Sequence, residues 1–530
     1  YPTIVYTKIL KSLYPDVPVV LGGIEASLRR LTHYDYWKDG LRKCILCDSG
    51  ADMIIYGMGE KPIIQLCREL QKGRDIHDIK DIPQTVWLSN EADIPGGITD
   101  NDIVLHSHEE CLKNKIAQAE NFKHIEEESN MLHAHRLLQA VDNVFAVVNP
   151  PYQPMTTEEI DKIYDLPFTR LPHPKYKDKR IPAYEMIKHS VNIHRGCFGG
   201  CAFCTISAHQ GKFIVSRSKE SILKEVRKIV AMPDFKGYIS DLGGPSANMY
   251  GMAGHNKSIC EKCRRPSCIN PKICPNLNTD HSRLIDIYQS VDAIPGIKKS
   301  FIGSGVRYDL LLYKSKDEAA NVAARKYTKE LICKHVSGRL KVAPEHTSDT
   351  VLRFMRKPPF SQFEEFKRIF DDINKREKLN QQIIPYFISS HPGCHAEDMA
   401  ELAVITKRLN FHLEQVQDFT PTPMTVSTET WYSGFDPYTL EKVFSAKTPR
   451  EKLAQRQFFF WYKPEERRNI ERELSLMGRR DLIGKLYNGN RSYADAKQQS
   501  KKPMQPNENH RTDNSRKAKS GHVRGRNSGR

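Results

Sequence analysis

Three cysteines within eight residues could together bind a metal cluster. The segment reads Cys197-Phe-Gly-Gly-Cys201-Ala-Phe-Cys204, with the spacing C-x3-C-x2-C, and it follows the apolar stretch 190–193. A cubane iron–sulfur cluster has four irons, and each is normally held by a cysteine thiolate. Because no further cysteine occurs before Cys260, three thiolates would leave one iron open. An open metal position is what a catalytic site needs and what a structural site avoids.

Two other interpretations of this segment are a zinc site and three buried cysteines without metal. A structural zinc needs four ligands, and the segment offers only His194 as a nearby fourth. The spacing, with Phe203 before the last cysteine, is typical of radical S-adenosylmethionine (SAM) enzymes. From Val17 to about Gly484 the chain resembles the YgiQ family of radical SAM proteins, most closely over 181–434.

The resemblance implies a cofactor set and a first group of site residues. Cys197, Cys201 and Cys204 would hold a [4Fe-4S] cluster, SAM would chelate its open iron, and an electron from the cluster would cleave SAM to a 5′-deoxyadenosyl radical. The strand that ends in Gly243-Gly244 corresponds to the one that contacts SAM's amino group in related enzymes.

Two later strand ends carry further candidates. Ser304 and Arg307 offer a hydroxyl and a guanidinium that could meet the ribose or carboxylate of SAM. Lys341-Val-Ala-Pro-Glu345-His346, with Val351–Lys357, resembles a segment whose acid contacts the active site in related barrels, so Glu345 is the predicted catalytic residue, with His346 beside it for proton handling.

A second cysteine group occupies a hydrophilic insertion at 255–280. It contains four cysteines within 15 residues, in the pattern Cys260-x2-Cys263-x4-Cys268-x5-Cys274-Pro. An insertion this polar needs something to hold it together, and a metal would supply that folding energy. The C-x2-C start suits zinc and the Cys-Pro end suits an auxiliary iron–sulfur cluster, so both remain open.

Composition limits the class of protein. Hydrophobic residues make up 39% of the chain, no run of 18 apolar residues exists, and no transmembrane helix is expected. The 13 clustered cysteines do not suggest a disulfide framework, which favours a reducing cytoplasm. The net charge is +17, and the tail Lys501–Arg530 holds nine Lys and Arg against two acids. RNA binding and a merely solvated tail both fit this charge.

The predicted fold is α/β. Strand-like segments recur through 181–430 with helices between them, which predicts a full or partial (β/α) barrel with its site at the strands' carboxyl ends. Before it, Val17-Pro-Val-Val-Leu-Gly-Gly and Asp52-Met-Ile-Ile-Tyr-Gly read as parallel strands of a doubly wound domain that resembles the second half of a cobalamin-binding-type domain. Its first half is not in this sequence, so no cobalamin is predicted.

The expected organisation has five parts. They are a partial α/β domain at 1–87 with its N-terminal part missing, a linker that wraps the barrel at 88–180, the radical SAM barrel at 181–430, a helical extension at 431–490, and a disordered basic tail at 491–530. In the extension, Phe458-Phe-Phe-Trp-Tyr462 is expected to pack against the barrel rather than stack on bases.

The leading hypothesis is a radical SAM enzyme that abstracts hydrogen from an unidentified substrate and receives electrons from a partner such as flavodoxin or ferredoxin. The main alternative is a metal-stabilised nucleic-acid-binding protein without catalysis. It explains the second cysteine group and the charge, but not a three-thiolate loop beside a strand that ends in glycines. A third hypothesis, an electron-transfer iron–sulfur protein, would require four ligands per cluster.

Overall fold

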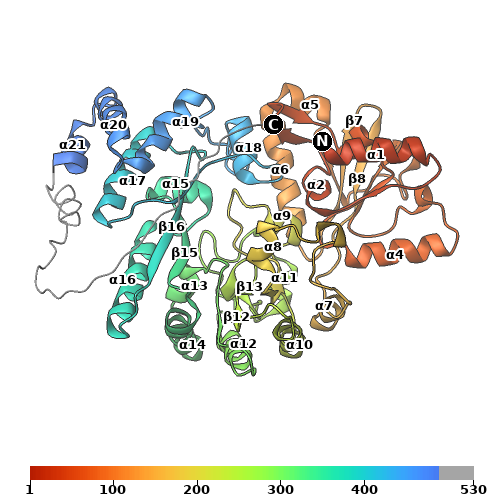
Figure 1. Ribbon diagram of the computed structural model, residues 1–530. Coiled ribbons are helices and arrows are strands. Elements are labelled where there is room, and N and C mark those ends of the chain that lie inside the picture. Colours follow the sequence, from red (N-terminus) through yellow and green to blue (C-terminus); the bar gives the residue numbers. More distant parts are fainter. Residues whose placement is uncertain (489–530) are drawn as a thin grey trace, which may run out of the picture.

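A computed structural model of the chain describes residues 1–488, and the predicted basic tail at 491–530 lies outside this range. Figure 1 shows an N-terminal sheet with its helices beside a second α/β unit, and C-terminal helices against the far side of that unit. Within residues 1–488, no helix is long and apolar enough to cross a membrane.

The N-terminal unit is built on a six-stranded sheet in the order β1-β4-β5-β8-β7-β6. Its strands are β1 (Val20–Leu21), β4 (Met53–Ile55), β5 (Thr85–Ser89), β6 (Asp102–Leu105), β7 (Arg136–Val141) and β8 (Val144–Val148). Its helices are α1 (Pro2–Leu13), α2 (Gly23–Leu28), α3 (Ile45–Ser49), α4 (Glu60–Gln71), α5 (His108–Lys113) and α6 (Lys115–Ser129), and a hairpin of β2 (His33–Asp35) and β3 (Gly40–Arg42) joins them.

The predicted parallel pair is present, but the sheet around it is mixed. β1 pairs with β4 in parallel, whereas β4, β5, β8 and β7 pair in antiparallel succession. Four of the six strands come from residues 85–148, most of which we expected to be a linker. The linker prediction is therefore wrong for this segment. Its strands are short and close through a tight hairpin, in which Asp142 adopts a positive φ of 52°.

The second unit is a partial barrel, and its strands recur through 181–430 with helices between them, as predicted. Its strands are β9 (Ser190–Asn192), β12 (Tyr238–Ile239) with β13 (Asp241–Gly243), β14 (Lys299–Ser300), β15 (Arg339–Glu345), β16 (Gln382–Ser389) and β17 (Gln415–Asp418). The pairs β9–β13, β12–β14, β15–β16 and β16–β17 are all parallel. Single backbone hydrogen bonds, such as Ile302 N to His335 O at 3.0 Å, continue the wall between them.

Helices cover the outside of the barrel and alternate with its strands. They are α10 (Lys219–Val230), α12 (Ser282–Asp292), α13 (Tyr308–Leu312), α14 (Glu318–Glu330), α15 (Asp349–Met355), α16 (Phe360–Arg376) and α17 (Ala396–Arg408). The amphipathic helices bury apolar faces, as Phe363, Phe366 and Phe370 of α16 do in the main hydrophobic core.

The C-terminal helices extend the same core. They are α18 (Val426–Ser433), α19 (Pro449–Arg456), α20 (Pro464–Leu476) and α21 (Arg480–Ile483). Phe458 and Phe459 are fully buried in the core cluster that also contains the barrel strands. The prediction that this aromatic run packs against the barrel is confirmed.

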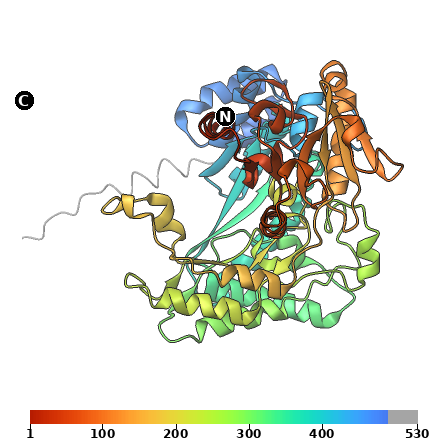
Figure 2. The same cartoon turned by 90° about the vertical axis from the view of Figure 1, so that its right-hand side faces the viewer.

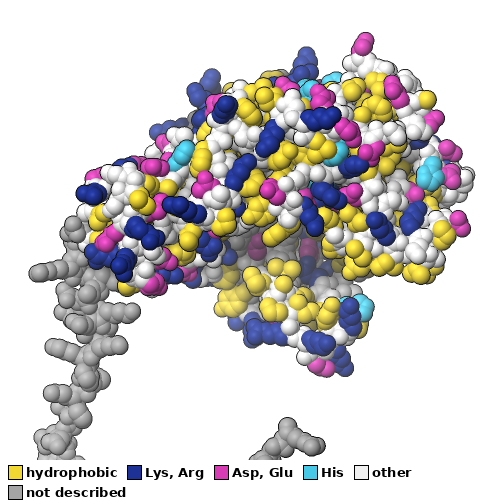
Figure 3. Space-filling model, turned by 90° about the horizontal axis from the view of Figure 1, so that it is seen from above, with side chains coloured by type: hydrophobic (Ala, Val, Ile, Leu, Met, Phe, Trp, Pro, Cys, Tyr) yellow, Lys and Arg dark blue, Asp and Glu magenta, His cyan; other side chains and the backbone are white. Residues whose placement is uncertain are grey.

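Residues 165–188 project from the body as an arm. The arm follows α7 (Thr157–Tyr164) and ends in the short helix α8 (Pro182–Ile187) just before β9. Figure 2 shows it at the left, away from both units, and Figure 3 shows it below a hollow in the surface.

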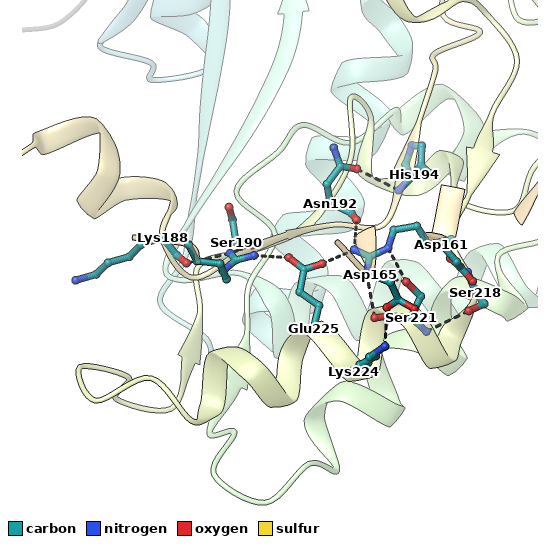
Figure 4. Close-up of polar contacts among 12 residues, drawn as sticks. Asp161, Asp165, Lys188, Ser190, Asn192, His194, Ser218, Ser221, Lys224 and Glu225 are labelled. Carbon is teal, nitrogen blue, oxygen red and sulfur yellow. Dashed lines mark hydrogen bonds and ion pairs between the residues drawn. The ribbon is translucent and has the colours of Figure 1, made fainter. Parts of the chain in front are cut away.

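Two arginines donate hydrogen bonds to the unpaired edge of β9. The other edge of this strand pairs with β13, so the carbonyls of Ser190 and Asn192 face away from the sheet. Arg170 donates to Ser190 O at 2.7 Å, and Arg217 donates to Asn192 O at 2.9 Å. Glu225 of α10 bridges the two guanidiniums, and Figure 4 shows it between Ser190 and Asn192. Side chains here occupy the place of a further strand, so the barrel stays open at β9.

Candidate active site

The three-cysteine loop lies between β10 (His194–Arg195) and α9 (Ile206–Gln210) and is tightly packed. Gly196 has a φ of +85°, and a Cβ there would lie 2.1 Å from the carbonyl oxygen of Phe213. Gly200 has a φ of +58°, and its Cβ would lie 2.7 Å from Ser267 Cβ. Both positions therefore require glycine, for backbone conformation and for space.

The three thiols are partly buried, and for Cys197 and Cys204 burial disfavours the free thiolate. Burial raises the pKa of Cys197 to about 11 and that of Cys204 to about 12. Both groups are therefore protonated at neutral pH unless a metal displaces the proton. The backbone amide of Gly199 acts in the opposite direction on Cys197 by stabilising the negative sulfur.

Arg307 contacts the loop directly. Its Nη1 donates to Cys201 Sγ at 3.3 Å, while Nε and Nη2 bind the Asp309 carboxylate at 2.9 and 2.6 Å. Burial acts to raise the pKa of Asp309, but the Arg307 guanidinium holds it below its ordinary value. The backbone of Arg307 is fixed by two hydrogen bonds with the side chain of Asn248. A fixed positive charge thus lies beside the predicted cluster ligands.

Glu345 is buried at the end of β15 and lacks one hydrogen-bond partner. It adopts a left-handed backbone with φ 69° at an irregularity in the strand register. Its Oε1 lies 3.7 Å from Lys357 Nζ, and its Oε2 contacts no donor in the described residues. Burial raises the pKa of Glu345, and Lys357 opposes that shift. A strained residue with an unsatisfied buried oxygen is typical of a ligand-binding position.

His346 does not share this position. Its Nδ1 accepts from Ser348 N at 3.0 Å, and its Nε2 lies 3.3 Å from Met399 Sδ and 3.5 Å from Cys394 Sγ. Burial lowers its pKa to about 3. The side chain is therefore engaged in packing, and the expectation that it assists Glu345 in proton handling is not supported by its contacts.

Gly243 and Gly244 are required by their neighbours. A Cβ at Gly243 would lie 2.1 Å from Ser304 Oγ, and one at Gly244 would lie 2.4 Å from the His194 ring. Ser304 Oγ donates to Asp241 Oδ1 at 3.0 Å, which joins the ends of β13 and β14. The structure brings Gly243 and Ser304, two residues predicted to contact SAM, close together, and the Ser304 hydroxyl is already paired within the protein.

The second cysteine group packs against the back of the three-cysteine loop. Cys268 N donates to Phe198 O at 3.1 Å, and Ser267 Oγ donates to Gly199 O at 2.9 Å. Cys260 Sγ accepts from Asn276 Nδ2 at 3.4 Å. Among residues 1–488, no three His, Cys, Asp or Glu side chains gather closely enough to share one ion. The insertion and the loop are nevertheless one packed body.

The comparisons with known proteins assign the family. Residues 1–190 match a family described as Radical SAM N-terminal, and 414–529 match a domain of unknown function, DUF3362. The UPF0313 protein of Bacteroides thetaiotaomicron is 70% identical over 498 residues, which cover 92% of this chain and 80% of that protein. This chain belongs to the UPF0313 family. The UPF0313 protein YgiQ of Escherichia coli is 39% identical and covers 91% of this chain and 72% of its own length, which confirms the resemblance to YgiQ.

Solved structures give a weaker likeness to this UPF0313 chain. The radical SAM methyltransferase TsrM of Kitasatospora setae, with cobalamin and a [4Fe-4S] cluster bound, aligns at a TM-score of 0.40 with 14% identity, covering 79% of this chain and 59% of its own. The cobalamin-dependent SAM radical enzyme OxsB aligns at a TM-score of 0.44 with 12% identity. The alignment covers 81% of this chain and 44% of the OxsB chain. Both scores are below 0.5, so the fold described above rests on this chain's own strands and helices.

Three charged residues of the UPF0313 site were not singled out from the sequence. They are Asp241, Asp309 and Lys357. Asp241 accepts a hydrogen bond from Ser304, Asp309 pairs with Arg307, and Lys357 lies near Glu345. Lys357 lies in the quoted Val351–Lys357 segment, which could have suggested it. Asp241 and Asp309 are recognisable only from their contacts with Ser304 and Arg307 in the folded structure.

Proposed function

We propose that this UPF0313 chain is a radical SAM enzyme in which Cys197, Cys201 and Cys204 bind a [4Fe-4S] cluster. The observation that supports it most is the Arg307–Cys201 contact, which places a buried cation against a predicted ligand at the barrel's strand ends. The residues present fit such a cluster, since an anionic group gains from a nearby guanidinium and a loop amide. Sequence spacing and the Radical SAM N-terminal match agree with this function.

Cys197, Cys201 and Cys204 would hold the cluster, and the reduced cluster would supply one electron to SAM, whose cleavage would yield methionine and a 5′-deoxyadenosyl radical able to take a hydrogen atom from the substrate. The protein's own contribution is position and polarity. Arg307 donates a hydrogen bond to the sulfur of one cysteine ligand, and Asp309 fixes the orientation of Arg307. Glu345 offers Oε2 as an acceptor to a donor group of SAM or substrate, and Lys357 stabilises its negative charge.

The deciding experiment measures SAM cleavage by anaerobically reconstituted protein reduced with dithionite. The expected result is 5′-deoxyadenosine and methionine in equal amounts, accelerated by a cell fraction that contains the substrate. The Cys197→Ala/Cys201→Ala/Cys204→Ala variant should produce neither. Cys67→Ala, an exposed cysteine of α4, is the matched control and should cleave SAM normally. No product from reconstituted parent protein with any fraction would leave the metal-stabilised nucleic-acid-binding protein as the better description.

We also propose that Cys260, Cys263, Cys268 and Cys274 bind a second metal, as zinc or as an auxiliary iron–sulfur cluster. The hydrogen bond from Cys268 N to Phe198 O supports a role in holding the first loop in place. Elemental analysis of the triple alanine variant tests this proposal, because the first site is then removed. Residual zinc, or residual iron with sulfide, would identify the metal, and neither in folded protein would refute it.

Electron supply is the remaining part of the proposal. A cluster that cleaves SAM must be reduced before each turnover, so a flavodoxin or ferredoxin is the proposed partner. Replacing dithionite with reduced flavodoxin or ferredoxin should sustain 5′-deoxyadenosine formation. If neither protein sustains it while dithionite does, the electron donor is of another class.

A further inference from the structure

The arm at 165–188 exposes six large apolar or aromatic side chains to solvent. Its exposed large side chains are Leu166, Phe168, Leu171, Tyr176, Met186 and Ile187, with exposed fractions of 49%, 65%, 64%, 40%, 73% and 61%. Contiguous exposed apolar surface usually marks an interaction site. We propose that this arm binds single-stranded nucleic acid beside the open edge of the barrel. The inference does not depend on the proposed radical chemistry.

The charge of the arm favours a polyanion. Lys175, Lys177, Lys179 and Arg180 lie within six residues, with Asp178 as the single acid among them. None of the four cations forms an ion pair with a described residue, although ion pairs are frequent elsewhere on the surface. A second copy of the arm would carry the same positive charge and repel it. A group of four lysine and arginine side chains without ion-pair partners is typical of surfaces that bind the phosphates of nucleic acid.

A groove on the arm offers ring-bearing side chains to a base. It has a volume of about 420 Å³, and its walls include His173, Tyr176 and Tyr184, with Arg170 and Lys188 at its base. Lys175 Nζ lies 5.0 Å from the centre of the Tyr176 ring, so one face combines an aromatic platform with a cation. Stacking on such rings while cations follow the backbone is how proteins bind single strands without sequence preference.

A lipid surface explains these features less well. Membrane-surface binding is typical of a long amphipathic helix with one continuous apolar face. The only α-helix of the arm, α8, has six residues, and the ring-bearing side chains line a concave groove. Figure 3 shows the basic side chains on the outer part of the projection, with apolar side chains nearer the hollow.

The arm is fixed at its base, so a bound strand would be held at a defined place. Arg170 binds Glu225 and the carbonyls of Lys188 and Ser190, and Tyr184 Oη donates to Arg170 O at 3.0 Å. Figure 4 shows this polar network running from Lys188 along Ser190 to Glu225. Because Ser190 begins β9, these contacts anchor the arm beside the edge of β9 that pairs with no other strand in the described residues.

Fluorescence anisotropy with a 20-residue oligouridylate and with oligothymidylate tests the proposal on the full chain. We expect Lys175→Glu/Lys177→Glu/Lys179→Glu/Arg180→Glu to weaken binding at least tenfold. The slope of log Kd against log salt should fall by up to about three, since each phosphate contact in a single strand contributes about 0.7. Comparing the two oligonucleotides shows whether RNA or DNA is preferred.

The matched control reverses four exposed cations elsewhere, in Lys316→Glu/Lys326→Glu/Arg468→Glu/Arg472→Glu. It should keep affinity within about threefold of the parent. A single change, Tyr176→Ala, should weaken binding by about tenfold, and Tyr176→Phe should restore it, because stacking needs the ring and not the hydroxyl.

Several results would overturn the proposal. They are an absence of oligonucleotide binding at low salt, equal losses in the arm and control variants, and unchanged binding in Tyr176→Ala. Sedimentation with phosphatidylserine vesicles that depends on the arm, while oligonucleotide binding does not, would assign the arm to a membrane instead. Crosslinks from 4-thiouridine in the oligonucleotide that map to 166–187 would support it independently of affinity.

Discussion

A hydrogen bond between Gln118 and Glu429 joins α6 of the N-terminal unit to α18, one of the C-terminal helices. Gln118 Nε2 of α6 donates to Glu429 Oε2 of α18 at 3.0 Å, and both side chains are almost fully buried. Burial raises the pKa of Glu429 from 4.5 to about 7, and the hydrogen bond from Gln118 only partly opposes this shift. The carboxyl group is therefore a pH-sensitive element in the contact between the two units.

The contribution of Glu429 to stability should disappear as the pH rises. Between pH 4.5 and 7 the unfolded chain releases this proton while the folded chain keeps it, so folding is progressively disfavoured in that window. Glu429→Gln removes the titration. The difference in the free energy of unfolding, variant minus parent, should therefore increase by about 3 kcal/mol from pH 4.5 to pH 8. Urea titrations at both pH values measure it, and Glu465→Gln, an exposed site in α20, should show no such gain.

Replacing Arg307 with methionine should separate stability from cluster binding. The change leaves the buried Asp309 carboxylate unpaired, which should lower the free energy of unfolding by about 3 kcal/mol or more. Arg307→Met/Asp309→Leu should recover most of that loss, because neither charge remains. Iron content after reconstitution should stay low in both variants if the contact with Cys201 stabilises the cluster. Normal iron in the double variant would show that Arg307 serves only Asp309.

Glu345→Gln should reduce SAM cleavage without removing the cluster. The amide has nearly the same shape but no negative charge, and it leaves Lys357 without its carboxylate partner. We expect iron content to be unchanged and 5′-deoxyadenosine formation to fall at least tenfold, measured under dithionite with saturating SAM. A parallel loss of iron would mean that Glu345 supports the fold of the loop instead of a ligand.

Two glycines with similar backbones should respond very differently to alanine. Gly196 and Gly211 have φ values of +85° and +80°, so alanine is conformationally strained at either. Only at Gly196 would the added carbon meet another atom, the Phe213 carbonyl at 2.1 Å. Gly211, with ψ 168°, lies in a backbone region that is nearly exclusive to glycine, so Gly211→Ala should cost about 1–3 kcal/mol of stability from strain alone and keep its iron, whereas Gly196→Ala should lose most of its iron. Equal iron in the two variants would contradict the tight packing of the loop.

The barrel could be predicted from the sequence because its signals are local. The six strands recur at regular intervals with helices between them, and Cys197, Cys201 and Cys204 lie close together in the chain. The buried position of Phe458 and Phe459 likewise followed from an apolar run within a charged region.

What the sequence did not reveal depends on contacts between distant segments. Thr85–Ser89 pairs with β4 and β8 in the sheet, but the predicted boundary after residue 87 divides this strand between the α/β domain and the linker. Gly243 is glycine because Ser304 fills the adjacent space, 61 positions along the chain, and that steric demand leaves no pattern in the sequence. The predicted boundary after residue 180 divides the projecting arm between the linker and the barrel for the same reason, because its exposure is a property of the folded molecule.

The arginines on β9 have a consequence for the protein's resistance to aggregation. An unpaired strand edge is a template for pairing with another chain and hence for aggregation. Arg170 and Arg217 already engage the carbonyls of Ser190 and Asn192 that an incoming strand would need. These two carbonyls are therefore not available to an edge strand of another molecule, so the unpaired side of β9 should resist edge-to-edge aggregation without a covering strand.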